Sequence, residues 1–403
     1  MRELPAAWCR VPLQDVVPSV DYGISEALDA DTRGIPVLRM NNIQDDRFDL
    51  GDLRYSSTPV PEKMLLQHGD VLFNRTNSID HIGKTAMWQD SLPAASFASY
   101  LVRLNVDVQR VLPAYLAQWL MCRQVRRQVR SISTAAVQQV NVNPSRLLEL
   151  NIDFPVDLME QQRIVDVLDS VMEFQRGIEA SIAKFEALRF GVMEELVELE
   201  CGLFGDVLKQ GPQNGIYKPA SSYGLQGTPI VRIDSFSRGK SDLTWGLLRV
   251  AASGGEVARY GLDVGDIVIN RVNTPELVGK STSVRRLGEP TIFESNMMRC
   301  KLHRSLADPV FTETWLGSSI VKRYFLTRAK SAISQASING DDVRNCPFPK
   351  MDMPRQLAFL ERLDAVEDQR LAEVAELAKL RQLKQGLVDD LLSGRRSVSA
   401  VAA

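Results

Sequence analysis

The chain has 403 residues, of which 44% are hydrophobic and 24% are charged. This ordinary globular composition excludes wholesale disorder, a collagen and a chain made only of coiled coil, and the length predicts about two to four domains. The formal net charge of −2 excludes a uniformly basic nucleic-acid-binding coat, although it allows local basic faces.

Short β-rich runs, PVLRM, DVLFNR and SYLVRLNV, dominate the first part of the chain, and a helical pattern over 111–129 follows them. A long helix is then expected from Glu160 to Glu200, because this stretch has no proline and apolar residues recur there every seven positions. Its predicted face for helix pairing or partner docking contains Ile164, Val171, Ile178, Phe185 and Val192.

The same succession follows a second time. The β-rich runs are PIVRI, DIVINR and MMRCKLH, a helical pattern covers 308–329, and a second long helix is expected from Arg355 to Leu392. A helix of this length needs a partner for its apolar stripe, so the two long helices should pair with each other. The predicted face of the second helix for helix pairing or partner docking contains Leu371, Val374, Leu377, Leu380 and Leu387.

An internal repeat accounts for this succession. GDVLFNRTNSIDHIGKT from Gly69 returns as GDIVINRVNTPELVGKS from Gly265, 196 residues later and without a gap. Flanking blocks such as QQVNVN and SQASIN repeat in the same order, which indicates duplication of a two-part unit. We therefore predict an α+β protein in which two pseudo-twofold-related domains are separated by two long antiparallel coiled-coil helices. The expected segments are a first domain over 1–158, a central helix over 159–201, a second domain over 202–352, and a C-terminal helix and tail over 353–403.

The repeated Gly-Lys triplets, Gly83-Lys84-Thr85 and Gly279-Lys280-Ser281, resemble the end of a phosphate-binding loop. Both copies lack the glycine that this loop needs five residues earlier, so a β-hairpin turn is the better interpretation. The Asn-Arg-x-Asn before each turn is left with two explanations. Arg75 and Arg271 form ion pairs with Asp70 and Asp266, or they contact a nucleic acid.

Basic residues gather at the same place in both halves. Four arginines lie between Arg123 and Arg130, Lys322 to Lys330 repeat the pattern, and a loop rich in Gln and Asn follows each cluster. The first long helix is acidic, with ten acidic and four basic residues over 160–200. The near-zero net charge therefore hides basic domains and an acidic connector, and the basic faces favour nucleic-acid binding. The candidate DNA-binding residues are Asn74, Arg75, Asn77, Lys84, Arg126, Arg127, Gln138, Gln139 and Asn141 in the first half, and Asn270, Arg271, Asn273, Lys280, Arg328, Lys330, Gln335 and Asn339 in the second.

Patterns of catalytic sites and metal centres are missing from the sequence. It has no Pro-Pro-aromatic loop of a DNA-adenine methyltransferase, no nucleophile elbow, no C-x-x-C pair and no histidine pair spaced for one helix face. It also has no leader pattern and no apolar stretch of membrane-spanning length. We expect a soluble, cytoplasmic protein without a catalytic residue, metal site or cofactor of its own.

The chain resembles the specificity (S) subunit of type I restriction-modification systems. The resemblance rests on LPAAWCRVPLQDV from Leu4, on the paired GDVLFNRTN and GDIVINRVN blocks, and on the helix starts MEQQRIVDVLDSV from Met159 and MPRQLAFLERLDAV from Met353. The second helix start departs from the family pattern, because Met-Pro-Arg-Gln stands where Glu-Gln is usual.

This resemblance implies a non-catalytic DNA-binding subunit with two target recognition domains, each recognising one half of a split, asymmetric site. It also implies partners: two methyltransferase subunits that use S-adenosylmethionine and, in the full complex, two restriction subunits that use ATP with Mg²⁺. Three alternatives remain from the residues alone: a scaffold of long helices that binds no DNA, a fragment of an enzyme whose catalytic domain is encoded elsewhere, and a nuclease or ATPase. The sequence does not reveal the half-sites or the spacer between them.

Overall fold

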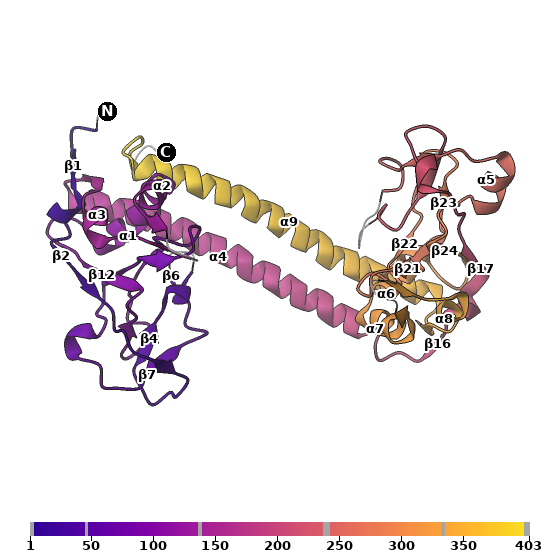
Figure 1. The fold of residues 1–403 in the computed structure, drawn as a ribbon, viewed down its shortest axis with the longest axis horizontal. Coiled ribbons are helices and arrows are strands. Elements are labelled where there is room, and N and C mark those ends of the chain that lie inside the picture. Colours follow the sequence, from indigo (N-terminus) through magenta and orange to yellow (C-terminus); the bar gives the residue numbers. More distant parts are fainter. Residues whose placement is uncertain (1–3, 45–46, 136–138, 237–241, 332–334, 399–403) are drawn as a thin grey trace. The chain divides into compact units, whose positions relative to one another are not determined.

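The computed structural model describes residues 4–44, 47–135, 139–236, 242–331 and 335–398, and it contains both helices and strands (Figure 1). The chain divides into two units. Unit 1 comprises Met1–Ala180 and Val374–Ala403, and unit 2 comprises Ser181–Glu373. The mixed helix and strand content agrees with the predicted class, and each unit is described by itself below.

The β-rich part of unit 1 is built from two four-stranded sheets and a small ribbon. The first sheet has the order β10–β8–β12–β2, and all of its strand pairs are antiparallel. The second has the order β11–β4–β7–β3, and the ribbon has the order β13–β14–β9. The strands of the first sheet are Thr85–Met87, Val71–Asn74, Leu101–Asn105 and Ser19–Tyr22, those of the second are Ser96–Phe97, Pro36–Leu38, Arg54–Ser56 and Leu28–Asp29, and those of the ribbon are Thr134–Ala135, Val140–Asn141 and Thr76–Asn77.

Unit 2 repeats this topology. Its main sheet has the order β22–β20–β24–β17, its second sheet β23–β18–β19, and its ribbon β25–β26–β21. Each strand of the main sheet and ribbon matches one of unit 1, so the duplication inferred from the sequence is confirmed at the level of topology. The strands in these orders are Ser281–Ser283, Ile267–Asn270, Met297–Leu302 and Leu208–Asn214, then Ile292–Phe293, Thr228–Val231 and Arg249–Val250, then Lys330–Ser331, Ala336–Ser337 and Val272–Asn273.

Short helices and terminal strand pairs complete both units. Each region predicted as one helical pattern is a pair of helices instead, with a break at Cys122 in unit 1 and at 317–318 in unit 2. The helices are α1 (Pro113–Met121), α2 (Arg123–Ser131) and α3 (Pro144–Leu148) in unit 1, and α5 (Gly254–Tyr260), α6 (Pro309–Leu316), α7 (Ser319–Arg328) and α8 (Gly340–Arg344) in unit 2. The additional strand pairs are β1 (Trp8–Pro12) with β15 (Asn151–Pro155), β5 (Ile43–Gln44) with β6 (Arg47–Phe48), and β16 (Cys201–Leu203) with β27 (Pro347–Pro349).

The two long helices are α4 (Leu158–Glu194) and α9 (Met353–Leu391). In unit 1, Ile164 of α4 belongs to the same core as Val388 of α9. Glu179, further along α4, pairs with Arg381 at 2.9 Å. From the first of these pairs to the second, the residue number increases along α4 and decreases along α9. The two helices therefore run antiparallel in unit 1. In unit 2, Arg189 of α4 lies 3.8 Å from Glu367 of α9.

The predicted pairing residues of these helices differ in burial. Ile164, Ile178 and Leu377 are buried, and Val171, Phe185, Val192, Leu380 and Leu387 are half-buried. At two positions the prediction of helix pairing is wrong, because Leu371 and Val374 are 44% and 39% exposed. Partner docking by these two residues stays a prediction. Around residues 370–373, polar side chains of α9 contact α4. Arg370 lies 3.9 Å from Glu186, and Glu373 accepts a hydrogen bond from Ser181.

No helix in the described part of the chain combines the length and the apolar character needed to cross a membrane.

Candidate nucleic-acid interface

The Gly-Lys triplets form tight turns between antiparallel strands. Gly83 and Gly279 have φ angles of 73° and 76°, a region that favours glycine. Their N–H groups donate to the carbonyl oxygens of Asn74 and Asn270 at 2.8 and 2.9 Å, which closes each hairpin. A Cβ atom on Gly83 would lie 2.7 Å from Val129 of α2. These turns therefore seat a helix, and the hairpin interpretation is confirmed.

Asn74 and Asn270 were predicted to contact DNA, and their burial contradicts this. Both side chains are fully buried, and their Nδ2 atoms point to the carbonyl oxygens of Met40 (3.3 Å) and Ile233 (3.5 Å). Each is the last residue of a central strand of the main sheet. A side chain enclosed in this way has no access to a base edge, so these asparagines support the loop rather than bind DNA.

The next asparagine of the motif is a turn residue in both halves. The Oδ1 atoms of Asn77 and Asn273 accept hydrogen bonds from the N–H groups of Ser78 and Thr274, both at 2.8 Å. Asn77 is half-buried, whereas Asn273 is 9% exposed. Direct base contact by Asn273 is therefore also contradicted.

The lysines of the triplets bind the segment that follows β4 in unit 1 and β18 in unit 2. Lys84 Nζ donates to Gln44 Oε1 at 2.8 Å, and Lys280 Nζ donates to the carbonyl oxygens of Phe236 (2.6 Å) and Ile233 (3.1 Å). Both lysines are half-buried. Their repeated presence is thus explained by structure in both halves.

Arg75 and Arg271 do not pair with the aspartates of their motif, so the ion-pair explanation is wrong. Asp70 instead pairs with Arg103 at 3.0 Å, and Asp266 lies 3.3 Å from Lys301. The hydrogen bond from Arg103 lowers the pKa of Asp21, its second partner, whereas burial raises the pKa of Asp266. These pairs lie on the main sheet and leave the two motif arginines for other contacts.

The guanidinium of Arg75 is held between two neighbours. It lies over the ring of Tyr22, 5.1 Å from the ring centroid, and its Nη2 donates to Asn141 Oδ1 at 3.1 Å. Arg271 is anchored to the main chain instead, because its Nη1 donates to the carbonyl oxygen of Ser295 at 3.2 Å. Both side chains are half-buried, so each keeps part of its surface open to solvent.

Buried polar atoms without a hydrogen-bond partner among the described residues gather around this motif. They include Oδ1 of Asn74, Nε of Arg75, Oγ1 of Thr76 and Oδ1 of Asn270. Such atoms are uncommon in folded proteins, and each one costs free energy. Their recurrence at equivalent asparagines marks the same strand end in both units as a place where the fold is not optimised for stability.

The helix beside each turn presents a basic face. In α2, Val125 and Val129 are buried, and Arg123, Arg127 and Arg130 are exposed. Arg126 is half-buried, and its Nη2 donates to the carbonyl oxygen of Asp80 at 3.0 Å, which joins α2 to the loop after β9.

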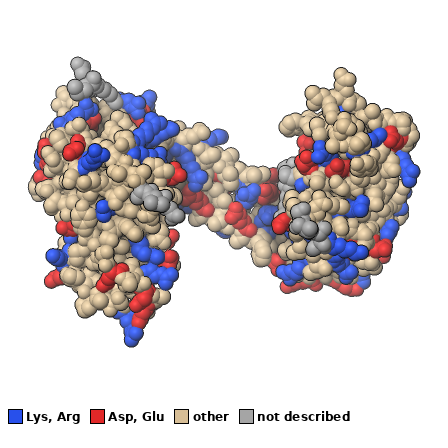
Figure 2. Space-filling model, viewed as in Figure 1, with Lys and Arg blue, Asp and Glu red and all other residues tan. Residues whose placement is uncertain are grey.

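In unit 2, α7 buries Val321 and Phe325 and exposes Arg323 and Arg328. Lys330 follows α7 and is exposed as well. Figure 2 shows blue side chains gathered where Figure 1 places α2, and a second group where it places α7 and α8.

The candidate Gln and Asn residues of the two loops differ in burial. Gln138 lies outside the described residues. Gln139 and Asn141 are half-buried, and Gln335 is exposed. Asn339 is exposed and caps α8, since its Oδ1 accepts from the N–H groups of Asp341 (2.8 Å) and Asp342 (3.1 Å).

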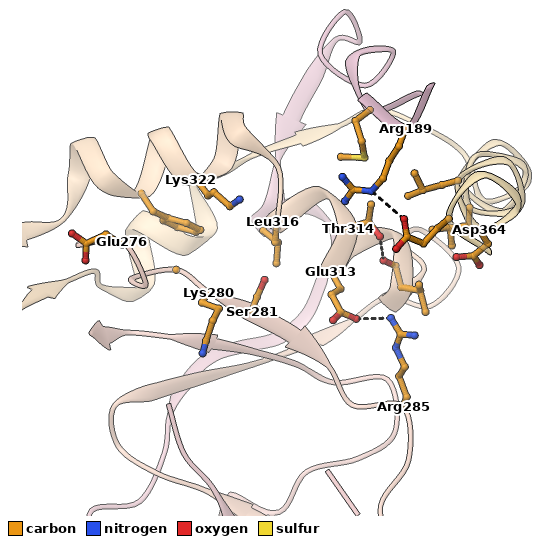
Figure 3. Close-up of a pocket in the computed structure, with 18 of the residues that line it drawn as sticks. Arg189, Glu276, Lys280, Ser281, Arg285, Glu313, Thr314, Leu316, Lys322 and Asp364 are labelled. Carbon is orange, nitrogen blue, oxygen red and sulfur yellow. Dashed lines mark hydrogen bonds and ion pairs between the residues drawn. The ribbon is translucent and has the colours of Figure 1, made fainter. Parts of the chain in front are cut away.

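A cavity of about 670 Å³ in unit 2 lies between the hairpin turn at Gly279, the helices α6 and α7, and the long helices (Figure 3). Glu313 is its most enclosed acid, at 8% exposure. It accepts hydrogen bonds from Thr282 (3.1 Å), Ser283 (2.7 Å) and Arg285 (3.0 Å), so its charge is already compensated. Among the described residues, no group of three or more His, Cys, Asp or Glu is placed to hold a metal ion.

Sequence reasoning missed the aromatic residues of this surface. Tyr22 and Tyr100 are 50% and 47% exposed, and both adjoin Arg75: Tyr22 through its ring, and Tyr100 through its carbonyl oxygen, which accepts from the Arg75 N–H at 3.0 Å. Neither is repeated in the second half, so a search for shared residues passes over them. Comparison of unshared residues next to a shared motif would have found them.

Comparisons with known proteins agree with this architecture. Residues 5–184 match a family model described as the type I restriction modification DNA specificity domain. The type I restriction enzyme EcoKI specificity subunit of Escherichia coli is 24% identical, covering 99% of this chain and 95% of that protein. The StySPI specificity subunit of Salmonella potsdam is 23% identical, with 99% and 95% covered.

A chain from a solved type I restriction-modification assembly has the same fold, with a TM-score of 0.60 at 14% identity, covering 98% of this chain and 100% of that one. The resemblance inferred from the sequence is therefore confirmed: residues 5–184 match the type I restriction modification DNA specificity domain, and the whole chain is similar to type I restriction enzyme specificity subunits.

Proposed function

We propose that this chain is the sequence-specific DNA-binding specificity subunit of a type I restriction-modification complex. The observation that carries the proposal is the repeated surface: in both units a hairpin turn, an arginine, a three-stranded ribbon and a basic helix occur in the same order. Arginine and lysine on such a face neutralise phosphates, and an α-helix such as the basic helix is narrow enough to enter the DNA major groove. A scaffold function without DNA binding does not explain why this basic arrangement occurs in both units.

The recognised site is bipartite and asymmetric in this proposal. Each unit supplies one target recognition domain and binds one half-site. Because Tyr22, Tyr100 and Asn141 have no identical counterparts in unit 2, the two half-sites differ in sequence. The long helices α4 and α9 act as an antiparallel coiled-coil spacer that sets the number of base pairs between the half-sites.

Catalysis belongs to the partners. Two methyltransferase subunits bind S-adenosylmethionine and methylate adenine, and two restriction subunits use ATP with Mg²⁺. This chain contributes DNA recognition and docking, and it holds no cofactor. The long helices, including the exposed apolar side chains of Phe174 and Phe190, supply surface for the methyltransferase subunits.

A binding assay with the complex tests the proposal. The chain is purified together with the methyltransferase subunits of its system, and its affinity for genomic DNA fragments is measured at 50 and 200 mM salt. The proposal requires selective binding of some fragments and an affinity that falls steeply with salt, because phosphate contacts release counterions. Equal, weak binding of every fragment would favour the scaffold alternative.

A further inference from the structure

Arg75 and Arg271 are shared by the two units, but the residues next to them differ. These differing neighbours are the candidates for base discrimination. The inference rests on the proposed DNA-binding function and adds which positions set the sequence of each half-site. Arg75 and Arg271 occupy the same place in the repeat, since both directly follow a central strand of the main sheet.

Three positions beside the arginine can be matched by strand register. Tyr22 pairs with Val102 in β2–β12, and Asn214 pairs with Met298 in β17–β24, one repeat later. Tyr100 and Asn296 accept the arginine N–H through their carbonyl oxygens, at 3.0 and 2.8 Å.

The third matched pair lies on the ribbon. Asn141 pairs with Thr76, and Ser337 pairs with Val272, directly after the arginine in both units. We call Tyr22, Tyr100 and Asn141 in unit 1, and Asn214, Asn296 and Ser337 in unit 2, the flanking residues.

The flanking residues are accessible to a ligand. Tyr22 and Tyr100 are each about half exposed, Asn214 is exposed, and Asn141, Asn296 and Ser337 are half-buried. In contrast, the shared asparagines Asn74 and Asn270 are fully buried. The shared residues of the motif therefore support the loop, and the unshared ones face outward.

An arginine that is the same in both domains cannot account for two different half-sites. A contact from such an arginine to the phosphate backbone positions the protein and carries no base information. We propose that Arg75 and Arg271 anchor phosphates, and that the flanking residues beside them determine the base preference of each half-site.

The flanking residues of the two units differ in chemistry, as different base preferences require. Tyrosine rings offer an apolar face, which suits the methyl group of thymine and stacking against a base. Asparagine amides offer one donor and one acceptor side by side, which matches the N6 and N7 edge of adenine. Unit 1 presents two tyrosines where unit 2 presents two asparagines, so the two domains recognise unlike base edges.

Exchanging the flanking residues tests the proposal in the complete complex. The variant Tyr22→Asn/Tyr100→Asn/Asn141→Ser places the unit 2 set in unit 1, and Asn214→Tyr/Asn296→Tyr/Ser337→Asn makes the reverse change. Val108→Asn, at a position that is 51% exposed and outside the flanking residues, is the matched control. Each complex is incubated with a randomised DNA library, and the bound sequences are determined together with the affinity for wild-type sites.

We expect the first variant to change base preference at one or two positions of the first half-site only, and the second to change the second half-site only. The control should keep both half-sites. Arg75→Ala should weaken binding about equally across sequences and leave the preferred bases unchanged.

Unchanged base preferences in both exchange variants would overturn the proposal, and so would a loss of affinity that is uniform across sequences. The half-exposed single variant Tyr22→Asn serves if the triple variant does not fold. A wild-type complex that selects no sequence from the library would refute the proposed function itself, which separates the two failures.

Discussion

Gln161 and Gln356, one repeat apart, fasten the first turns of α4 and α9 through the same three hydrogen bonds. Gln161 Nε2 donates to the carbonyl oxygens of Pro155 (2.8 Å) and Arg110 (2.9 Å), and its Oε1 accepts from Leu112 N–H at 2.8 Å.

Gln356 makes the equivalent contacts to Met351 (2.7 Å), Leu306 (2.9 Å) and Asp308 (2.9 Å). Both glutamines are fully buried, so the amide satisfies three backbone groups that water does not reach. The departure from the family pattern at Met-Pro-Arg-Gln leaves this contact intact.

Removing this amide should destabilise the protein. Gln161→Ala leaves a buried N–H and two carbonyl oxygens without their partner, so we expect a loss of about 2 to 4 kcal/mol in the free energy of unfolding. Chemical denaturation followed by circular dichroism measures the loss. Gln162→Ala, one residue along on the exposed face, should change stability by less than about 0.5 kcal/mol. Equal effects of the two changes would contradict this role.

The hairpin turns should not tolerate a side chain. Gly83→Ala places a Cβ atom 2.7 Å from Val129 on a backbone with φ of 73°, and the left-handed conformation alone costs about 1 to 2 kcal/mol. We expect a lower melting temperature and weaker DNA binding, because the turn seats the basic helix α2. Gly177→Ala is the control, since nothing lies within 4 Å of its Cβ position inside α4. A Gly83→Ala protein as stable as the control would refute the tight-turn account.

Asp169 of α4 should make stability depend on pH. Burial raises the pKa of this half-buried carboxyl group, and Asp166 and Glu173 raise it further. The native state therefore holds the proton to a higher pH than the unfolded chain, and this contribution to stability is lost as the pH rises through the raised pKa.

Asp169→Asn should consequently gain stability over the wild type between pH 4 and pH 7. The gain should stay under about 1 kcal/mol, because solvent screens a half-exposed group. Denaturation midpoints across this pH range measure it. A difference between variant and wild type that is constant with pH would contradict the assignment.

The apolar face of α4 should matter for stability only where it is buried. Ile178 is 5% exposed and Phe190 is 66% exposed, although both are large apolar residues of the same helix. Ile178→Ala should cost about 2 to 4 kcal/mol, and Phe190→Ala less than about 0.5 kcal/mol. Thermal unfolding of the two variants distinguishes them, and a larger effect at Phe190 would show that the face is wrongly assigned.

The sequence predicted the large features well because they depend on repetition and periodicity. The repeat at Gly69 and Gly265 led to the duplicated strand order, and the heptad containing Ile164 and Ile178 led to α4. The register of a long helix against its partner is harder to predict from the sequence. Leu371 and Val374 fit the apolar spacing, yet ion pairs such as Arg189 with Glu367 occupy that part of the helix pair. The spacing of apolar residues does not predict such ion pairs.

The site was predicted less completely. Repetition pointed to Asn74 and Asn270, but a repeated residue is as readily retained for support inside the fold as for contact with a ligand. Burial, which separates the two cases, depends on the segments at Met40 and Ile233 that cover these side chains. Tyr22 is distant from Arg75 in sequence and meets it only through strand pairing.

Adenine methylation across a host genome, mapped with and without this gene in the presence of its methyltransferase subunits, tests the central claim most directly. The account predicts a single split motif that appears only with the gene, with two unlike half-sites separated by a fixed number of unspecified base pairs. Methylation that is the same in both strains, or a continuous palindromic motif, would contradict it.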